Sequence, residues 1–186
     1  MEKKLDRRVK YTIMMLKDAL VELMQKEHIS KISVKALCER ADVNRSTFYA
    51  HFEDQYDLLH SIEQEAMDNI THYLSRQDYT DNIPVSFQVL NRILVYVKEN
   101  AGLFRALLSD NGGSNIQKDI LKVPEIFDFQ IYNSQGERTK EYLAVFAITG
   151  CVSILQKWLE DGTPESTETI SDLVLQVLYK GITSFR

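Results

Sequence analysis

Residues 44–51 carry a high density of side chains that can form hydrogen bonds outside the protein. The segment reads Asn-Arg-Ser-Thr-Phe-Tyr-Ala-His, in which only Phe48 and Ala50 are purely apolar. Arginine can fork onto guanine, small hydroxyls can hold phosphates, and a tyrosine hydroxyl can donate to a phosphate oxygen. These residue types in one short segment favour a surface that contacts nucleic acid. The candidate contact residues are Arg45, Ser46, Thr47, Tyr49 and His51, preceded by Asn44.

The elements that must position these side chains are two short helices joined by a tight turn. Ser33 and Asn44 are good N-cap residues for the two helices, which span about residues 34–41 and 45–52. The first has a narrow apolar face at positions 34, 37, 38 and 41, and little of the second is apolar. Asp42 occupies the turn, where the backbone needs a left-handed conformation that Asp tolerates better than most residues. This spacing is typical of a helix-turn-helix motif.

Charge is distributed unevenly along the chain, whose net charge is −5. Residues 1–50 contain 11 Lys and Arg against 7 Asp and Glu, whereas residues 51–186 contain 11 against 20. A basic N-terminal head on an acidic body is compatible with a head that faces phosphates, although this signal alone is weak.

The rest of the chain repeats apolar residues at helical spacing, and no run of strict alternation is long enough to predict a strand. We therefore predict an all-α protein with an N-terminal three-helix domain, residues 1–53, followed by a helical bundle domain, residues 54–186. The helices are expected at about 8–26, 55–76, 84–100, 101–108, 114–132, 137–160 and 166–185, in addition to the two short ones. Pro124 predicts a kink or break in the segment 114–132.

The last two helices are apolar on more than one face, which a core inside one chain seldom requires. We interpret them as half of a four-helix bundle completed by a second copy of the chain. A large core within one chain is the alternative. The expected interface residues are Val152, Leu155, Leu159, Leu173, Val174 and Val177.

The run ISVKALCERADVNRSTFYAHFEDQYDLL resembles the head of the TetR family, particularly in Thr47-Phe48-Tyr49, His51-Phe52 and Leu58-Leu59. The later segments AGLFRALLSDNGG and ITGCVSILQKWLEDGTPES resemble one C-terminal branch of the same family. The resemblance implies about nine helices, a homodimer joined through the last two of them, and binding to a palindromic DNA operator, as a repressor that a small molecule releases.

Matched position by position, the resemblance implies base-edge contacts from Arg45, Ser46 and Tyr49, with Lys35 also reaching the groove. Ser33, Thr47 and His51 would hold phosphates. Two positions depart from the family pattern: Asp42 stands where Gly is usual, and Gln55 where many members have a Lys that anchors the DNA backbone. The backbone contact is then either weaker here or made by the helix N-terminus itself.

A small-molecule site in the body is an open alternative to simple packing. Aromatic and Met side chains at helical spacing more often belong to the packed core than line a ligand-binding site. The candidates on the middle helices are Met67, Ile70, Tyr73, Phe87, Phe104, Phe127 and Phe129.

Other functional classes have less support. His60, Gln64, Asp68 and His72 follow one another at i+4 steps, but Gln64 is a poor ligand and only Asp68 and His72 could share an ion, so a solvated pair is the better interpretation. No glycine-rich phosphate loop, His-Glu-x-x-His or Gly-x-Ser-x-Gly motif is present, so no catalytic site, metal or cofactor is predicted. A helical dimeric scaffold or an enzyme without DNA binding is the alternative function.

Cys38 and Cys151 lie far apart, outside any Cys-x-x-Cys pair, and are expected to be reduced, buried thiols. No stretch approaches the roughly 18 uncharged apolar residues of a membrane span, and the N-terminus lacks an apolar signal core. We therefore expect a cytoplasmic protein.

Overall fold

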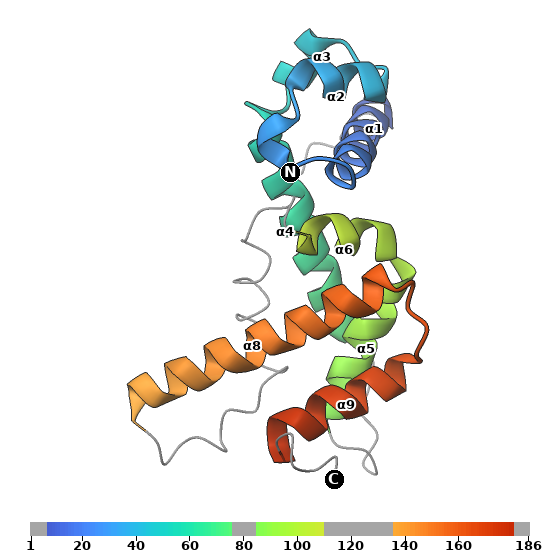
Figure 1. Cartoon of the computed structure of the whole chain (residues 1–186). Coiled ribbons are helices and arrows are strands. Elements are labelled where there is room, and N and C mark those ends of the chain that lie inside the picture. The colour runs from blue at the N-terminus through green and yellow to red at the C-terminus, as the bar shows by residue number, and fades with distance from the viewer. Residues whose placement is uncertain (1–6, 76–84, 110–135, 181–186) are drawn as a thin grey trace. The chain divides into compact units, whose positions relative to one another are not determined.

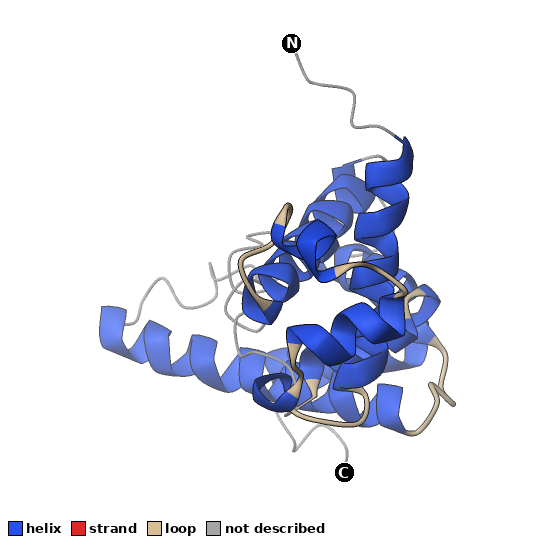
Figure 2. Ribbon diagram, turned by 90° about the horizontal axis from the view of Figure 1, so that it is seen from above, coloured by secondary structure: helices blue, strands red, loops and turns tan. Residues whose placement is uncertain are grey.

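The computed structural model describes residues 7–75, 85–109 and 136–180, and within these ranges every regular element is helical. Figure 2 shows helices joined by loops, with no strand in the described part of the chain. The predicted all-α class is confirmed. The predicted helix at 114–132, with its break at Pro124, lies outside the described residues.

The first compact unit contains the described residues up to Ala66 together with those from Ala106 at the end of α6. Its elements are α1 (Arg7–Met24), the 3-10 turn η1 (Ile29–Lys31), α2 (Val34–Ala41), α3 (Arg45–Tyr49) and the first half of α4 (Gln55–Ser75). Figure 1 shows α1, α2 and α3 grouped around a common centre. The unit extends beyond the predicted boundary at residue 53, because Leu58, Leu59 and Ile62 of α4 are buried.

The core of this unit is aliphatic around one aromatic ring. Phe48 of α3 is 0% exposed, and its ring lies 5.8 Å from that of Phe52. The fully buried partners that fill the space between the helices are Leu16, Leu20, Met24, Ile32, Leu37 and Leu58. Full burial of a Phe or Leu side chain contributes about 1.5–3 kcal/mol, so this packing fixes how α3 is held.

Two ion pairs cross between helices on the surface of this unit. Arg40 of α2 pairs with Glu22 of α1, and Lys17 of α1 pairs with Glu65 of α4. Exposed pairs of this kind contribute about 0–1 kcal/mol each, so they orient the helices more than they stabilise them.

The second compact unit contains the described residues from Met67 to Arg105 and from Gly136 onward. It holds the rest of α4, α5 (Val85–Glu99), most of α6 (Ala101–Leu108), α8 (Glu137–Glu160) and α9 (Thr167–Lys180). Helix α9 packs against both α5 and α8 (Figure 1). Its core joins Leu94 of α5, Trp158 of α8, and Ile170 and Val174 of α9.

Trp158 also organises the connection between α8 and α9. Its indole Nε1 donates a 3.3 Å hydrogen bond to the carbonyl of Glu165, and the Lys98 ammonium lies 5.6 Å from the ring centroid. The chain reverses through Gly162 and Thr163, whose φ angles of 84° and 58° are left-handed. The indole therefore holds a strained turn in place from inside the core.

Residues Glu141–Glu160 of α8 meet the length and composition criteria for a membrane span, with a mean hydropathy of 1.5. The sequence-based expectation that no stretch approaches such a span is therefore wrong for this helix. Core helices of soluble proteins meet the same criteria, and 33% of the window is buried inside the protein. Trp158 and Leu159 within it pack into the protein core, so the apolar character serves helix packing there.

Both cysteine side chains are shielded by the fold. Cys38 is 4% exposed and Cys151 lies against the α5–α8–α9 core. Burial raises the pKa of the Cys151 thiol to about 11, and it also raises the pKa of Cys38. Both thiols are therefore protonated and unreactive at neutral pH.

Candidate nucleic-acid interface

The turn between α2 and α3 has the left-handed geometry that the sequence predicts. Asp42 has φ 53° and ψ 45° and ends α2, where its N–H is directed at the carbonyls of Cys38 and Glu39. Val43 N–H then donates to the Cys38 carbonyl over 3.0 Å, which closes the helix end. The departure from glycine at this position is therefore accommodated without a change of turn type.

We expect Asp42→Val to lower the free energy of unfolding by about 1–2 kcal/mol, because a β-branched side chain clashes with the backbone in the left-handed region. Asp42→Asn should be neutral, since Asn tolerates the same region. Chemical denaturation followed by circular dichroism would measure both variants. Equal stability of the Val and Asn variants would show that the turn does not need this conformation.

Helix α3 begins at Asn44, as the sequence predicts. The Asn44 side-chain oxygen accepts a 3.0 Å hydrogen bond from the N–H of Ser46. The regular helix ends at Tyr49 rather than near residue 52. After Tyr49 the chain tightens into a turn, in which the His51 N–H donates to the Phe48 carbonyl three residues earlier, and the Phe52 ring lies 5.8 Å from that of Phe48.

The predicted contact residues share one property in the structure, which is solvent exposure close to α3. Phe48 is the buried anchor, so the remaining side chains of the helix face outward. The exposed members of the predicted set are Ser33, Lys35, Asn44, Arg45, Ser46, Tyr49 and His51, and Thr47 is half-buried. The structure thus leaves the donor-rich surface of residues 44–51 open to a partner.

Tyr49 is the largest exposed side chain of this surface. Its side chain is 53% exposed, and its ring meets that of Phe48 edge-on at 5.4 Å between centroids. One side of the ring is therefore braced by the core residue, while the phenol can reach outward. Such a braced aromatic loses little conformational freedom on binding.

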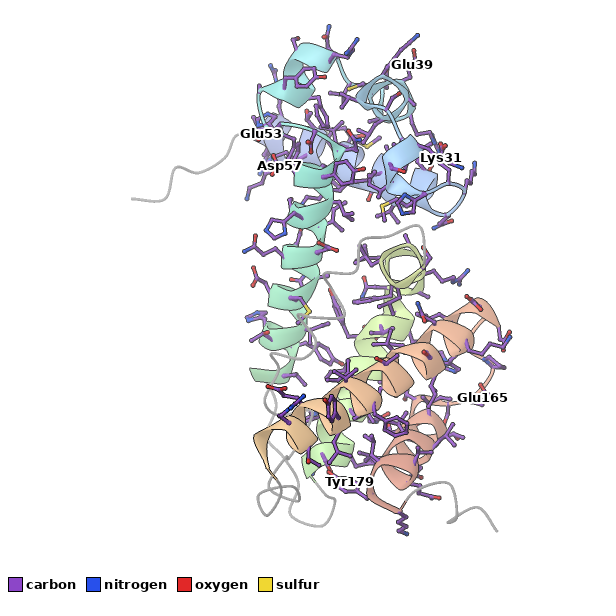
Figure 3. All side chains as sticks on the ribbon, turned by 60° about the vertical axis from the view of Figure 1, so that its left-hand side comes forward. Lys31, Glu39, Glu53, Asp57, Glu165 and Tyr179 are labelled. Atoms are coloured by element: carbon purple, nitrogen blue, oxygen red, sulfur yellow. The ribbon has the colours of Figure 1, made fainter. Side chains whose placement is uncertain are left out.

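Helix α2 contributes one wall of a hollow next to α3. The hollow has a volume of ≈ 520 Å³ and is lined by Lys35, Cys38, Glu39, Asp42, Val43, Asn44 and Arg45. The Lys35 ammonium lies 3.8 Å from the Glu39 carboxylate, and both side chains are well exposed. Figure 3 shows Glu39 projecting from α2. A pair this exposed is weak, so Lys35 can exchange Glu39 for a phosphate or base.

The beginning of α4, next to Gln55, bears on whether the amides of this helix could hold a phosphate in place of the lysine that many family members carry. The Asp54 carboxylate accepts from the N–H groups of Tyr56 at 2.8 Å and Asp57 at 2.9 Å, and the Asp57 carboxylate accepts from the Glu53 N–H at 3.0 Å. Figure 3 shows Glu53 and Asp57 close together there. Because these amides are occupied and three carboxylates surround them, this helix start disfavours a phosphate.

Tyr56 is 47% exposed on the first turn of α4, and the sequence analysis did not single it out.

The candidate effector residues divide into two groups. Ile70 and Phe104 are core residues, with 4% and 1% of their surface exposed. Met67, Tyr73 and Phe87 are half-buried. Tyr73 belongs to an aromatic row, with its ring 5.9 Å from Tyr96, which is in turn 5.8 Å from Phe104. Phe127 and Phe129 lie outside the described residues.

Three of the six predicted interface residues are buried within the single chain. Val152, Leu159 and Val174 are 4%, 0% and 4% exposed, so these side chains leave little surface for a second copy. Val174 belongs to the core that joins α5, α8 and α9. Leu155 and Val177 are half-buried, and Leu173 is 36% exposed.

Five large apolar side chains are exposed on α8 and α9, among them Leu173 of the predicted interface set, and we call them the α8–α9 apolar surface. Its members on α8 are 61–67% exposed, and those on α9 are 36–45% exposed. They are Tyr142, Val145, Phe146, Leu173 and Tyr179.

The described residues contain no group of three or more His, Cys, Asp and Glu side chains able to hold a metal ion. The His60 imidazole instead lies 4.0 Å from the Glu63 carboxylate, one turn along α4.

Comparison with known proteins assigns both parts of the chain to one family. Residues 16–62 match the model of bacterial regulatory proteins of the tetR family, and residues 86–180 match a transcriptional regulator C-terminal region of that family. An HTH-type transcriptional regulator of Bacillus subtilis, YxbF, is 22% identical over 175 residues, which are 88% of this chain. The chain spans 43% of the length of that relative.

Solved structures share the fold. A TetR transcriptional regulator from Streptococcus agalactiae superimposes with a TM-score of 0.68 at 22% identity, over 93% of this chain and 96% of that one. FadR from Bacillus subtilis, solved with stearoyl-CoA, superimposes with a TM-score of 0.64 at 16% identity, over 91% of this chain and 98% of that one. The dihydroxyacetone kinase operon activator DhaS superimposes with a TM-score of 0.56 at 20% identity, over 93% of this chain and 97% of that one.

An all-helical chain with a left-handed turn between two short capped helices, and with family matches over both of its parts, is a transcriptional regulator with a helix-turn-helix DNA-binding domain, and it belongs to the TetR family.

Proposed function

We propose that the protein binds a palindromic DNA operator as a homodimer and represses transcription from it. The observation that carries this proposal is the exposed polar surface of residues 44–51 on a helix anchored by the fully buried Phe48. A short helix with a buried anchor and outward donors is suited to the major groove, which an α-helix fits.

The exposed side chains divide into two roles. Arg45, Ser46 and Tyr49 lie on α3 itself and are assigned to base edges, with Lys35 reaching in from α2. The Ser33 hydroxyl accepts from the Ala36 N–H at 3.1 Å, which leaves its proton available for a phosphate. Thr47 and His51 complete the phosphate contacts that set the register of the helix on the duplex.

The dimer is assigned to the α8–α9 apolar surface. Monomeric soluble proteins seldom leave several large apolar side chains together in water, and such patches mark interaction sites. Gly150 of α8 has open space where a Cβ would point, so a second helix can approach closely there. A dimer contains two α3 helices, and the two half-sites of a palindromic operator lie one turn of the duplex apart, about 34–36 Å.

We further infer that a small molecule bound in the second unit controls DNA binding. FadR, a structural neighbour, was solved with stearoyl-CoA, which supports a ligand-responsive body. The half-buried Met67, Tyr73 and Phe87 are the described side chains best placed to change contacts when a ligand binds. Binding to a specific site is more favourable than binding to random DNA by only about 4–10 kcal/mol. A ligand that changes the spacing of the two DNA-binding domains at a cost of a few kcal/mol would therefore release the operator.

Repression is the expected sign, because a dimer bound across a promoter competes with polymerase for the same DNA. Structural neighbours include both an operon activator and a secondary repressor of an efflux pump. A reporter gene placed behind the natural upstream DNA would increase in expression when the regulator is deleted. A decrease would identify an activator.

Fluorescence anisotropy with labelled DNA flanking its own gene tests DNA binding directly. We expect one inverted repeat to bind with high affinity, with binding that weakens about 10³-fold or more between 50 and 200 mM salt if six or more phosphates are contacted. A helical scaffold or an enzyme would bind no sequence preferentially, and that result would overturn the proposed function.

A further inference from the structure

Asn44 and Ser46 form a closed hydrogen-bond pair at the start of α3, and its polarity is fixed by the backbone. The Ser46 N–H and the Ser46 Oγ both lie 3.0 Å from the same atom of the Asn44 side chain. A backbone N–H can only donate, so this side-chain atom must be the carbonyl oxygen and not the amide nitrogen. The Asn44 orientation is therefore settled by an observed contact.

The consequence concerns the single proton of the Ser46 hydroxyl. Because the Asn44 oxygen can only accept, the Ser46 Oγ must be the donor in their contact. The proton is thereby directed at the Asn44 side chain, and the two lone pairs of Oγ remain to accept a hydrogen bond. Ser46 is exposed, so those lone pairs are accessible to a partner.

We propose that Ser46 reads DNA bases only as a hydrogen-bond acceptor, and therefore selects adenine or cytosine over guanine or thymine at one position in each half-site. In the major groove, adenine N6 and cytosine N4 carry amino donors, whereas guanine O6 and thymine O4 are acceptors. An acceptor-only hydroxyl pairs with the first two and is repelled by the others. The inference rests on the proposed function, since it requires α3 to enter the groove.

The constraint comes from Asn44 and not from serine itself. A free serine hydroxyl rotates to donate or accept, and so contacts any base. Asn44 is thus a positioning residue for specificity: it caps α3 and also determines the polarity of its neighbour. Arg45, between them in sequence, carries donors only, so adjacent side chains present opposite polarity to the groove.

Selection from a random-sequence duplex library, followed by sequencing, tests the proposal with three variants. The wild type should enrich adenine or cytosine at one position per half-site. Ser46→Ala should lose that preference and keep all others, because only the acceptor is removed. Asn44→Ala should let all four bases occur there, because the freed hydroxyl can then donate as well.

Asn44→Asp is the matched control for the loss of the cap. Aspartate keeps an acceptor oxygen for both the Ser46 N–H and the Ser46 hydroxyl, so the base preference should match the wild type while overall affinity falls through phosphate repulsion. This variant keeps both the cap and the placement of the Ser46 proton, so a base preference that is lost in Asn44→Ala and kept here depends on the acceptor oxygen at position 44. Thermal melts of all variants verify folding.

A measurement on synthetic duplexes uses the selected site and needs no cap variant. Replacing the adenine or cytosine at that position by an analogue without the exocyclic amino group should weaken wild-type binding about fivefold. Ser46→Ala should bind both duplexes equally.

The outcomes separate the two proposals. Failure of the library to enrich any sequence would overturn the proposed function. Enrichment of an operator in which Ser46→Ala alters no position, or alters a position that carries guanine or thymine, would overturn the acceptor-only assignment while leaving DNA binding intact.

Discussion

Replacing Tyr49 by alanine should remove most of the affinity for the operator while the protein stays a folded dimer. Tyr49 is the largest exposed side chain of the residue 44–51 surface, and its ring is braced against the buried Phe48. Loss of a well-formed DNA contact typically costs about 1–3 kcal/mol. A dimer carries two copies, so we expect about 2–6 kcal/mol in total, which is roughly 30-fold or more.

Two further variants show how Tyr49 acts. Tyr49→Phe keeps the braced ring and removes only the hydroxyl, so it should lose the part of the affinity that comes from the phenol. Tyr11→Ala is the matched control, because Tyr11 is 61% exposed on α1 of the same unit and lies outside the predicted contact set. Fluorescence anisotropy at fixed salt would compare all three variants with the wild type.

Unchanged affinity of Tyr49→Ala would remove this residue from the interface. Equal losses for Tyr49→Ala and Tyr11→Ala would indicate a general effect on the unit, which a melting curve would detect. Only a loss specific to Tyr49 supports the assignment of α3 to the groove.

Phe146→Asp should convert the dimer to a monomer. Phe146 is 67% exposed on α8, in the α8–α9 apolar surface, and the substitution therefore removes little packing within the chain. Burial of a phenylalanine contributes about 1.5–3 kcal/mol, and a twofold interface contains it twice. The dimer dissociation constant should therefore increase by about 100-fold or more, before the cost of burying two carboxylates is added.

Sedimentation velocity over a concentration series would measure the change, with circular dichroism to confirm that the helices remain. The matched control is Asp18→Lys, a charge change at an exposed position of α1, outside the α8–α9 apolar surface. It should leave the dimer intact. A Phe146→Asp protein that still sediments as a dimer would assign the contact to another surface.

Loss of the dimer should also weaken DNA binding, because one α3 then reads one half-site alone. A monomer forfeits half the phosphate contacts, so the slope of log affinity against log salt should be about half that of the wild type. This link between oligomeric state and salt dependence distinguishes a dimer interface from an unrelated exposed patch.

Short-range features of the sequence were sufficient to predict the helix-turn-helix motif. Ser33 and Asn44 cap their helices as predicted, and Asp42 adopts the left-handed turn. These features depend on a residue and its neighbours within four positions, because cap and turn geometry is set by short-range hydrogen bonds. The start and end of α8 at Glu137 and Glu160 also agree with the sequence, where Gly136 before the helix and Gly162 after it mark the boundaries.

The spacing of apolar residues could not predict how segments distant in the sequence pack together. Val152, Leu159 and Val174 are apolar at helical spacing, as interface residues are, but all three side chains are already buried within the single chain. A pattern of apolar positions shows that a face is buried and does not show which partner buries it. Only the tertiary structure shows that Tyr142, Val145 and Phe146 are the large apolar side chains left exposed on the described part of α8.

The sequence by itself determined an all-helical chain with a donor-rich short helix after a left-handed turn, because helix caps and apolar spacing act over a few residues. The tertiary structure decided which of those donors are available. The Ser46 proton is committed to Asn44, and the first amides of α4 are taken by Asp54, neither of which residue types alone can reveal. A hydrogen bond depends on the positions of two particular atoms, and the fold alone sets those positions.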